Sequence, residues 1–336
     1  MIRVALDAMG GDHAPQAEIE GALLALKDLP ELRLQLVGPQ AVLEAELANY
    51  PSLDRSRLDV VDAPEVVGMD EKPIAAIRKK PRSTIMVGLG LQAADKSDAF
   101  ISAGNTGAVL AGSTVQLGLH EGVERATVGT LFPTAHLPVL VLDAGANVDC
   151  SPREMVGFAY LGTVFMRDVM DRAAPKVGLL NIGEEDEKGN AQAKETHLAL
   201  KQAPGLNYVG NIEGRDILGG HHRFGTVDVV VCDGFVGNIV LKFYESVGRF
   251  IIPLIRRKAP EVLQRADMRE VLEVLDYTNY GGAMLLGVKG TTIMCHGAST
   301  ANAFKNAVRV AVQSVEHRLS QHVGAEFAQH LTAGPR

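Results

Sequence analysis

Val227-Asp228-Val229-Val230-Val231-Cys232 leads directly into Asp233-Gly234-Phe235-Val236-Gly237-Asn238. The first stretch is a short β-branched run, which is typical of a strand buried on both faces of a sheet. The second stretch is a glycine-rich polar loop that opens a helical pattern. Together they predict one strand-loop-helix unit.

The same arrangement recurs along the chain. We expect further strands, each followed by a small polar loop and most by a helical pattern, at residues 2–6, 32–37, 58–61, 99–101, 139–142, 177–180 and 291–295. This alternation predicts an α/β fold, an αβα sandwich with a mostly parallel sheet between two layers of helices. We expect a single α/β domain over residues 1–336, with a helical amphipathic segment at about 240–275. In such sheets, ligands bind beyond the carboxyl ends of the strands, where these loops gather.

The composition indicates a globular protein of the cytoplasm. The chain has 336 residues, 46% of them hydrophobic, and a net charge of −7, whereas a nucleic-acid binder would carry a basic stripe. Three scattered cysteines without a CxxC pair imply neither a disulfide framework nor a zinc site. No signal peptide precedes the first strand, and no apolar run reaches the roughly 18 residues of a membrane-spanning helix.

The loop Ser102-Ala103-Gly104-Asn105-Thr106-Gly107 is the strongest candidate for an anion site. Its glycines let backbone N–H groups approach a phosphate, and a helix N-terminus near Thr106 adds partial positive charge. A capped helix start explains the segment equally well. The loop lacks the Gly-Lys-Ser/Thr ending of a Walker A motif, so ATP binding is not indicated.

Three further loops hold candidate polar groups. Asp7, Gly11 and His13 follow the first strand, where the glycines permit a sharp turn against a ligand, although a lone histidine beside a helix start is more often structural. Asp143, Asn147 and Asp149 carry oxygen ligands but not the spacing of a known metal loop, and we predict no metal. Lys188 stands in an acidic run before a helix, where a cation is unfavourable unless it holds an anion.

Two other segments are ambiguous. Gly88-Leu89-Gly90-Leu91-Gln92-Ala93 matches a loose dinucleotide pattern, but it follows the helix cap Ser83 or Thr84 and is interpreted as helix, so no nicotinamide site is predicted. Residues 243–258 place apolar side chains on one helical face beside several cations. Core or dimer packing, an anionic membrane surface and an acidic carrier protein all remain open for it. Pro253 argues against an unbroken helix there.

These stretches, in order, resemble one family, the bacterial phosphate acyltransferases of phospholipid synthesis (PlsX). The matching motifs begin at Asp7, Ser102, Asp143, Leu180, Gly210, Asp233, Tyr280 and His296. The resemblance implies a fold like that of the isopropylmalate dehydrogenase and phosphotransacetylase group. It also implies a homodimer without a cofactor, in peripheral contact with the inner membrane and a downstream glycerol-3-phosphate acyltransferase. The implied reaction converts acyl-ACP (the acyl thioester of acyl carrier protein) and inorganic phosphate into acyl phosphate for phospholipid synthesis.

The residues of the site are assigned as hypotheses. Lys188 and Asn238 are expected to be catalytic. Phosphate or substrate binding is expected at Asp7, Gly11, His13, Ser102, Gly104, Asn105, Thr106, Asn147, Asp233 and His296, and membrane or carrier contact at Phe250, Ile251, Leu254, Ile255, Arg256 and Arg257. Three other functions stay open: a short-chain phosphate acetyl- or butyryltransferase that uses acyl-CoA, a decarboxylating dehydrogenase and a non-catalytic membrane-surface scaffold.

Overall fold

The computed structural model of the chain describes residues 1–134, 136–223, 225–265, 267–268, 271–272 and 281–332. The chain divides into two compact units, a first unit of Met1–Ala126 with Tyr280–Arg336 and a second unit of Thr127–Asn279. The expectation of one domain over residues 1–336 stays a prediction. Tyr280 of the family motif and several residues of the 240–275 segment lie outside the described residues.

The strands of the first unit run in the order β3-β2-β1-β4-β13-β12. They are β1 (Ile2–Asp7), β2 (Leu32–Gly38), β3 (Leu58–Asp62), β4 (Ala99–Ser102), β12 (Ala283–Leu286) and β13 (Thr292–Met294). The first five in that order are parallel, and β12 pairs with β13 in the antiparallel sense. The loops that follow β1, β4 and β13 therefore leave the sheet at one edge.

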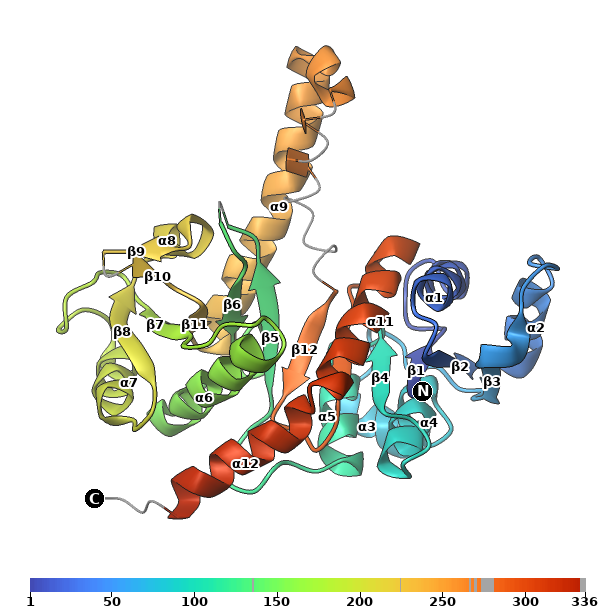
Figure 1. Cartoon of the computed structure of the whole chain (residues 1–336), viewed down its shortest axis with the longest axis horizontal. Coiled ribbons are helices and arrows are strands. Elements are labelled where there is room, and N and C mark those ends of the chain that lie inside the picture. Colours follow the sequence, from blue (N-terminus) through green and yellow to red (C-terminus); the bar gives the residue numbers. More distant parts are fainter. Residues whose placement is uncertain (135, 224, 266, 269–270, 273–280, 333–336) are drawn as a thin grey trace. The chain divides into compact units, whose positions relative to one another are not determined.

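Helices flank this sheet (Figure 1). They are α1 (Gln16–Asp28), α2 (Gln40–Leu47), α3 (Pro73–Lys79), α4 (Thr84–Ala93), α5 (Thr106–Gln116), α11 (Ala301–Glu316) and α12 (Leu319–Thr332). A Cβ at Gly21 would lie 2.5 Å from the Cβ of Phe304, so a glycine lets α1 and α11 pack closely. Likewise, a Cβ at Gly88 would lie 2.2 Å from the ring of Phe100, so α4 packs directly on β4.

The strands of the second unit run in the order β5-β6-β11-β7-β8. They are β5 (Thr127–Phe132), β6 (Val139–Leu142), β7 (Lys176–Leu180), β8 (Asn207–Ile212) and β11 (Val229–Val231), and all but β5 are parallel. A two-stranded ribbon, β9 (His221–His222) and β10 (Gly225–Thr226), stands apart. The helices are α6 (Pro152–Asp168), α7 (Ala191–Gln202), α8 (Gly214–Gly219) and α9 (Gly234–Lys258), and short 3-10 helices occur at Arg55–Arg57 in the first unit and Pro260–Gln264 in the second.

The predicted α/β class with a mostly parallel sheet and flanking helices is confirmed. The segment at residues 88–93 is helical, as expected, and Ser83 Oγ accepts the N–H of Met86 at its start. Among the described residues, no helix is both long enough and apolar enough to cross a membrane.

The expectation that Pro253 interrupts its segment is wrong. α9 continues without a break from Gly234 to Lys258 with Pro253 inside it. A proline inside a helix removes one backbone hydrogen bond at a cost of about 3 kcal/mol. Pro253 is exposed, so water can bond the freed carbonyl, and helix stability comes mainly from packing, here of Val240, Leu241 and Tyr244 on the core.

Candidate functional site

In the first unit, a chain of hydrogen bonds joins the ends of β1 and β4. The carboxylate of Asp7 is buried and accepts the hydroxyl of Ser102 at 2.7 Å, and Ser102 Oγ accepts the N–H of Gly104 at 3.0 Å. Burial raises the pKa of Asp7, and the hydrogen bond from Ser102 opposes that rise. Asp7 and Ser102 thus lie together, as expected. Their polar atoms bond each other and the N–H of Gly104, so they hold the loop in place.

The turn after β1 lies against the backbone of the β4 loop. A Cβ at Gly10 would lie 2.5 Å from the nitrogen of Gly104, so the two chains approach at a distance that only glycine allows. This contact and the hydrogen bonds of Ser102 hold Gly104 in place. The loop is therefore ordered before any ligand arrives.

Asn105 caps α5 and also anchors a neighbouring loop. Its Oδ1 accepts the N–H of Ala108 at 3.0 Å, and its Nδ2 donates to the carbonyls of Gly68, Met69 and Glu71. In the part of the chain that the structure describes, the N–H groups of Thr106 and Gly107 donate no hydrogen bond. These two donors stand at the positive end of α5, where helices commonly bind anions.

Glu18 of α1 was not predicted from the sequence. It is fully buried, and its Oε1 accepts the N–H of Gly11 at 2.9 Å. Burial raises the pKa of Glu18 to about 7. An acid in the first turn of a helix is ordinary at a surface, so nothing in the sequence marked this one as buried.

The remaining candidates of the first unit lie around the same turn. The N–H of Asp12 donates to the carbonyl of Gly297 at 2.7 Å, which brings the loop after β13 to the loop after β1. His296 Nδ1 accepts the N–H of Ala298 at 3.1 Å. His13 is exposed at the start of α1. The loops after β1, β4 and β13 thus form one cluster.

In the second unit, Asp143 holds the loop after β6. Its buried carboxylate accepts the N–H groups of Val128, Ala146 and Asn147 and the side-chain amide of Asn147 at 2.9 Å. Burial raises the pKa of Asp143. Asp143 and Asn147 therefore satisfy each other, and no metal-binding group of three or more His, Cys, Asp or Glu side chains occurs within the described ranges.

The N-terminus of α9 docks onto this loop. Asp233 Oδ1 accepts the N–H of Val236 as the helix cap, and the N–H of Gly234 donates to the carbonyl of Asn147 at 2.8 Å. The exposed side chain of Asn238 lies beside Gly145, where a Cβ would come within 3.2 Å of Asn238 Oδ1. Asn238 is therefore exposed to solvent beside the loop after β6, which Asp143 holds in place.

Lys188 stands in the exposed loop between β7 and α7. Its backbone carbonyl accepts Asn181 Nδ2 at 3.2 Å, and the next residue, Gly189, has a φ of +92° that glycine adopts readily. The loop is fixed again at Asp186, whose Oδ1 lies 3.1 Å from the Nε2 of buried His197. Asp186 also pairs with Lys201 of α7.

Lys188 and Asn238 follow adjacent parallel strands, β7 and β11. Their loops therefore leave the sheet at the same edge of the second unit. No hydrogen bond joins the two side chains among the residues that the structure describes. Each presents an exposed polar group, and their catalytic role stays a prediction.

The cysteines are poorly suited to act as nucleophiles. Burial raises the pKa of Cys150 and of Cys295 to about 12, and raises that of Cys232 well above its ordinary value. A thiol attacks as its thiolate, so a raised pKa disfavours attack at neutral pH. A covalent cysteine intermediate is therefore not expected.

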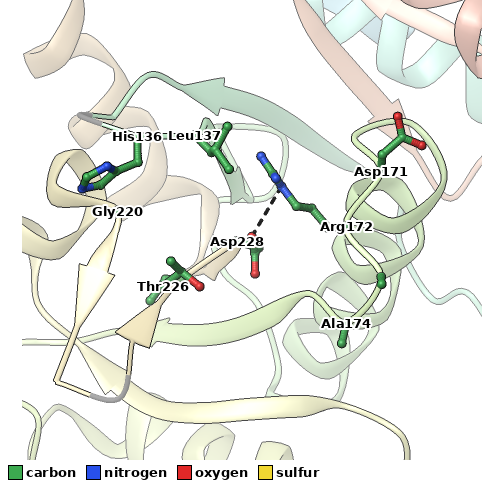
Figure 2. Close-up of a pocket in the computed structure, with 10 residues that line it drawn as sticks. His136, Leu137, Asp171, Arg172, Ala174, Gly220, Thr226 and Asp228 are labelled. Carbon is green, nitrogen blue, oxygen red and sulfur yellow. Dashed lines mark ion pairs between the residues drawn. The ribbon is translucent and has the colours of Figure 1, made fainter.

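A pocket of about 340 Å³ opens at the other edge of the second unit's sheet (Figure 2). Arg172 and Asp228 lie side by side in its lining and form an ion pair with their charged groups 3.7 Å apart. It lies where β7 and β11 begin, whereas the candidate loops follow the ends of these strands. This pocket is therefore separate from the loops of Lys188 and Asn238.

The outer face of α9 is apolar over much of its length. Phe243 and Phe250 have exposed fractions of 71% and 69%, and Leu254 of 37%, while Ile251 and Ile255 are partly exposed. Exposed Arg256 and Arg257 follow in the last turn. Large aromatic side chains at this exposure are typical of a surface that meets another apolar surface.

Comparison with known proteins agrees with these features. A family model described as "Fatty acid synthesis protein" matches residues 2–322. The phosphate acyltransferase of Nostoc punctiforme is 41% identical over 99% of this chain and 98% of its own length. That of Heliobacterium modesticaldum is 44% identical over 98% of each chain.

Solved structures show the same fold. A phosphotransacetylase from Streptococcus pyogenes superposes with a TM-score of 0.64 over 94% of each chain, at 15% sequence identity. At that identity the likeness concerns the fold alone, and it confirms the expected phosphotransacetylase group. With sequence relatives that match almost the whole length, the chain is a transferase that belongs to the phosphate acyltransferase (PlsX) family.

Proposed function

We propose that the protein transfers a long-chain acyl group from acyl-ACP to inorganic phosphate, giving acyl phosphate for phospholipid synthesis. One oxygen of phosphate bonds to the thioester carbonyl carbon, the carbon–sulfur bond breaks, and the proton of HPO4²⁻ ends on the carrier thiol. The observation that carries the proposal is the N-terminus of α5. There the N–H groups of Thr106 and Gly107 donate no hydrogen bond to any described residue, in a loop fixed by Asp7, Ser102 and Asn105.

Phosphate is anionic at neutral pH and needs positioning more than it needs a base. We assign the binding of its oxygens to the backbone N–H groups of Thr106 and Gly107. Gly104 and Asn105 shape this loop, because the N–H of Gly104 already donates to Ser102 Oγ. Gly11, His13 and His296 line the same cluster and complete the binding surface of the first unit. Asp7 and Ser102 act beneath it as positioning residues, because their polar atoms bond each other.

Lys188 and Asn238 are assigned to the reacting carbonyl. As phosphate adds, the carbonyl oxygen gains negative charge, which an ammonium group and an amide N–H can both stabilise. Both side chains are exposed. Lys188 lies in a loop whose backbone is held by Asn181, and Asn238 lies near the start of α9 beside Gly145. Asn147 and Asp233 support this surface by fixing the start of α9.

The outer face of α9 is assigned to peripheral contact with the inner membrane surface, near a downstream glycerol-3-phosphate acyltransferase. The exposed side chains of Phe250 and Leu254 supply apolar area, and Arg256 and Arg257 suit anionic headgroups. A Phe250→Ser/Leu254→Ser variant should lose binding to anionic vesicles and keep its acyl transfer in solution.

A homodimer is also proposed for the working protein. Dimer dissociation in this variant would instead assign the face to subunit packing.

The proposal is tested with purified protein, phosphate and three acyl donors. Two of them, acyl-ACP and acyl-CoA, carry the same long chain, and the third is a short-chain acyl-CoA. Acyl phosphate and carrier thiol should form together from acyl-ACP. Turnover of short acyl-CoA alone would favour a phosphate acetyl- or butyryltransferase. Vesicle binding without any acyl phosphate would favour a scaffold.

A further inference from the structure

One short stretch of the first unit has a charge opposite to that of the whole protein. Residues 72–82 carry five cations and no acid, although the net charge of the chain is −7: Lys72, Arg78, Lys79, Lys80 and Arg82. Lys80 pairs with Glu71, and Arg82 pairs with Asp62. The other three cations are exposed and form no ion pair among the described residues.

These cations surround an exposed apolar centre. Ile74, Arg78 and Lys79 are all exposed, and Ile74 and Arg78, four positions apart, lie on one face of α3. Ile74 is 59% exposed, and Met69, in the loop before α3, is 61% exposed. We name Met69, Lys72, Ile74, Arg78 and Lys79 the α3 face. An apolar centre with a charged rim is the usual anatomy of a protein interface.

The α3 face is joined directly to the proposed phosphate loop. Asn105, which caps α5, donates to the carbonyls of Gly68, Met69 and Glu71 at 3.1, 3.4 and 3.2 Å. Pro73, the first residue of α3, lies 2.5 Å from the position of a Cβ on Gly107. A partner seated on this face would therefore hold its reactive group beside the N-terminus of α5.

We propose that the α3 face is the docking surface for the acidic protein that carries the acyl thioester, an inference that rests on the proposed function. The charge of the face is complementary to such a partner. A membrane is a poorer match, because α3 spans only seven residues and the α3 face offers only two large apolar side chains, Met69 and Ile74. A nucleic acid would require a longer basic stripe than this one.

The test uses the full-length variant Lys72→Glu/Lys79→Glu. Its KM for acyl-ACP should rise about tenfold, because each reversal replaces an attraction at the rim by a repulsion. Its kcat with acyl-ACP should stay within about twofold of that of the unmodified protein. The same holds for its kcat/KM with the same acyl group on pantetheine, since a rim charge acts mainly on the encounter with the carrier. Added salt should raise the KM of the unmodified protein more steeply than that of the variant.

Lys27→Glu/Lys96→Glu is the matched control. Both lysines are exposed in the first unit, and they lie near the amino ends of β2 and β4, away from the phosphate loop. The net charge changes equally in the two variants. The control should keep the KM of the unmodified protein, and equal KM values in the two variants would overturn the proposal.

Binding of unacylated carrier, measured by fluorescence anisotropy, separates this inference from the proposed function. Carrier that binds the unmodified protein but not Lys72→Glu/Lys79→Glu supports the docking surface even if no acyl phosphate forms. No carrier binding by the unmodified protein overturns it, and so does carrier binding that the variant retains. A variant that loses only anionic vesicle binding would show that the face meets a membrane.

Discussion

Glu18 Oε1 accepts the backbone N–H of Gly11 at 2.9 Å, from a position wholly shielded from water. The other oxygen of this carboxylate has no partner among the described residues. Burial raises the pKa of Glu18 to about 7 from an ordinary value of 4.5. The glycine turn above it is therefore supported by a group that prefers to be protonated.

This relationship predicts how stability depends on pH. The folded protein keeps the Glu18 proton up to about pH 7, whereas the unfolded chain releases it near pH 4.5. The contribution of Glu18 is therefore fully present below pH 4.5 and is lost as pH rises to about 7, by roughly 3 kcal/mol. In Glu18→Gln, the free energy of unfolding should fall less than in the unmodified protein between pH 5 and 8.

Chemical denaturation at several pH values measures this difference. Glu31→Gln is the control, because Glu31 is largely exposed in the same unit. It should follow the unmodified protein at every pH. If Glu18→Gln follows the unmodified protein as well, Glu18 titrates normally and the prediction is wrong.

Lys188→Ala should reduce turnover by roughly 10²- to 10³-fold, the usual cost of removing one group that stabilises an oxyanion. Its melting temperature should hardly change, because the Lys188 side chain is exposed and forms no ion pair among the described residues. Lys194→Ala, which removes another exposed lysine from the nearby helix α7, should keep full turnover. Near-normal turnover of Lys188→Ala would remove this residue from the mechanism.

Tyr208→Phe should weaken the support of the Lys188 loop. The hydroxyl of Tyr208 lies 2.7 Å from His197 Nδ1, and the Nε2 of the same ring faces Asp186 in the loop. Without the hydroxyl, the buried ring loses a partner and its orientation toward Asp186. We expect kcat to fall several-fold in Tyr208→Phe and no further fall when it is added to Lys188→Ala, since both changes act through one group.

Tyr160→Phe is the control for Tyr208→Phe in this double-mutant comparison. It removes a hydroxyl that donates to the carbonyl of Pro204 at 2.8 Å in the same unit. It should lower stability by about 1 kcal/mol without changing kcat. Additive effects of Tyr208→Phe and Lys188→Ala on kcat would mean that Tyr208 acts on the fold in general.

Two glycines of α9 should respond in opposite ways to the same substitution. A Cβ at Gly237 would lie 1.8 Å from the carbonyl oxygen of Asp143, so Gly237→Ala must displace the start of the helix. It should destabilise the protein by roughly 2–5 kcal/mol and reduce turnover through Asn238. Apart from the neighbouring residues and backbone of α9 itself, no described atom lies within 4 Å of a Cβ at Gly248, and Gly248→Ala should stabilise by about 0.5–1 kcal/mol. Thermal melts of both variants would test this, and equal shifts would contradict it.

The sequence predicted the strands and the loops well, because β-branched runs and glycine-rich turns are local signals. It predicted less about where each polar atom points. Asp7 and Ser102 are 95 residues apart, and only the pairing of β1 with β4 turns their side chains toward each other. The burial of Glu18 likewise depends on tertiary packing, which an acid in the first turn of a helix does not reveal. The division into two units could not be predicted from the sequence, since no stretch of linker composition separates them.

The most direct test of the account is a reaction of long-chain acyl-ACP with phosphate that carries ¹⁸O at all its oxygens. Direct attack by phosphate breaks no phosphorus–oxygen bond. The acyl phosphate should therefore keep every labelled oxygen, and carrier thiol should appear in equal amount. Thiol release that needs no phosphate and yields unlabelled fatty acid would contradict acyl transfer to phosphate.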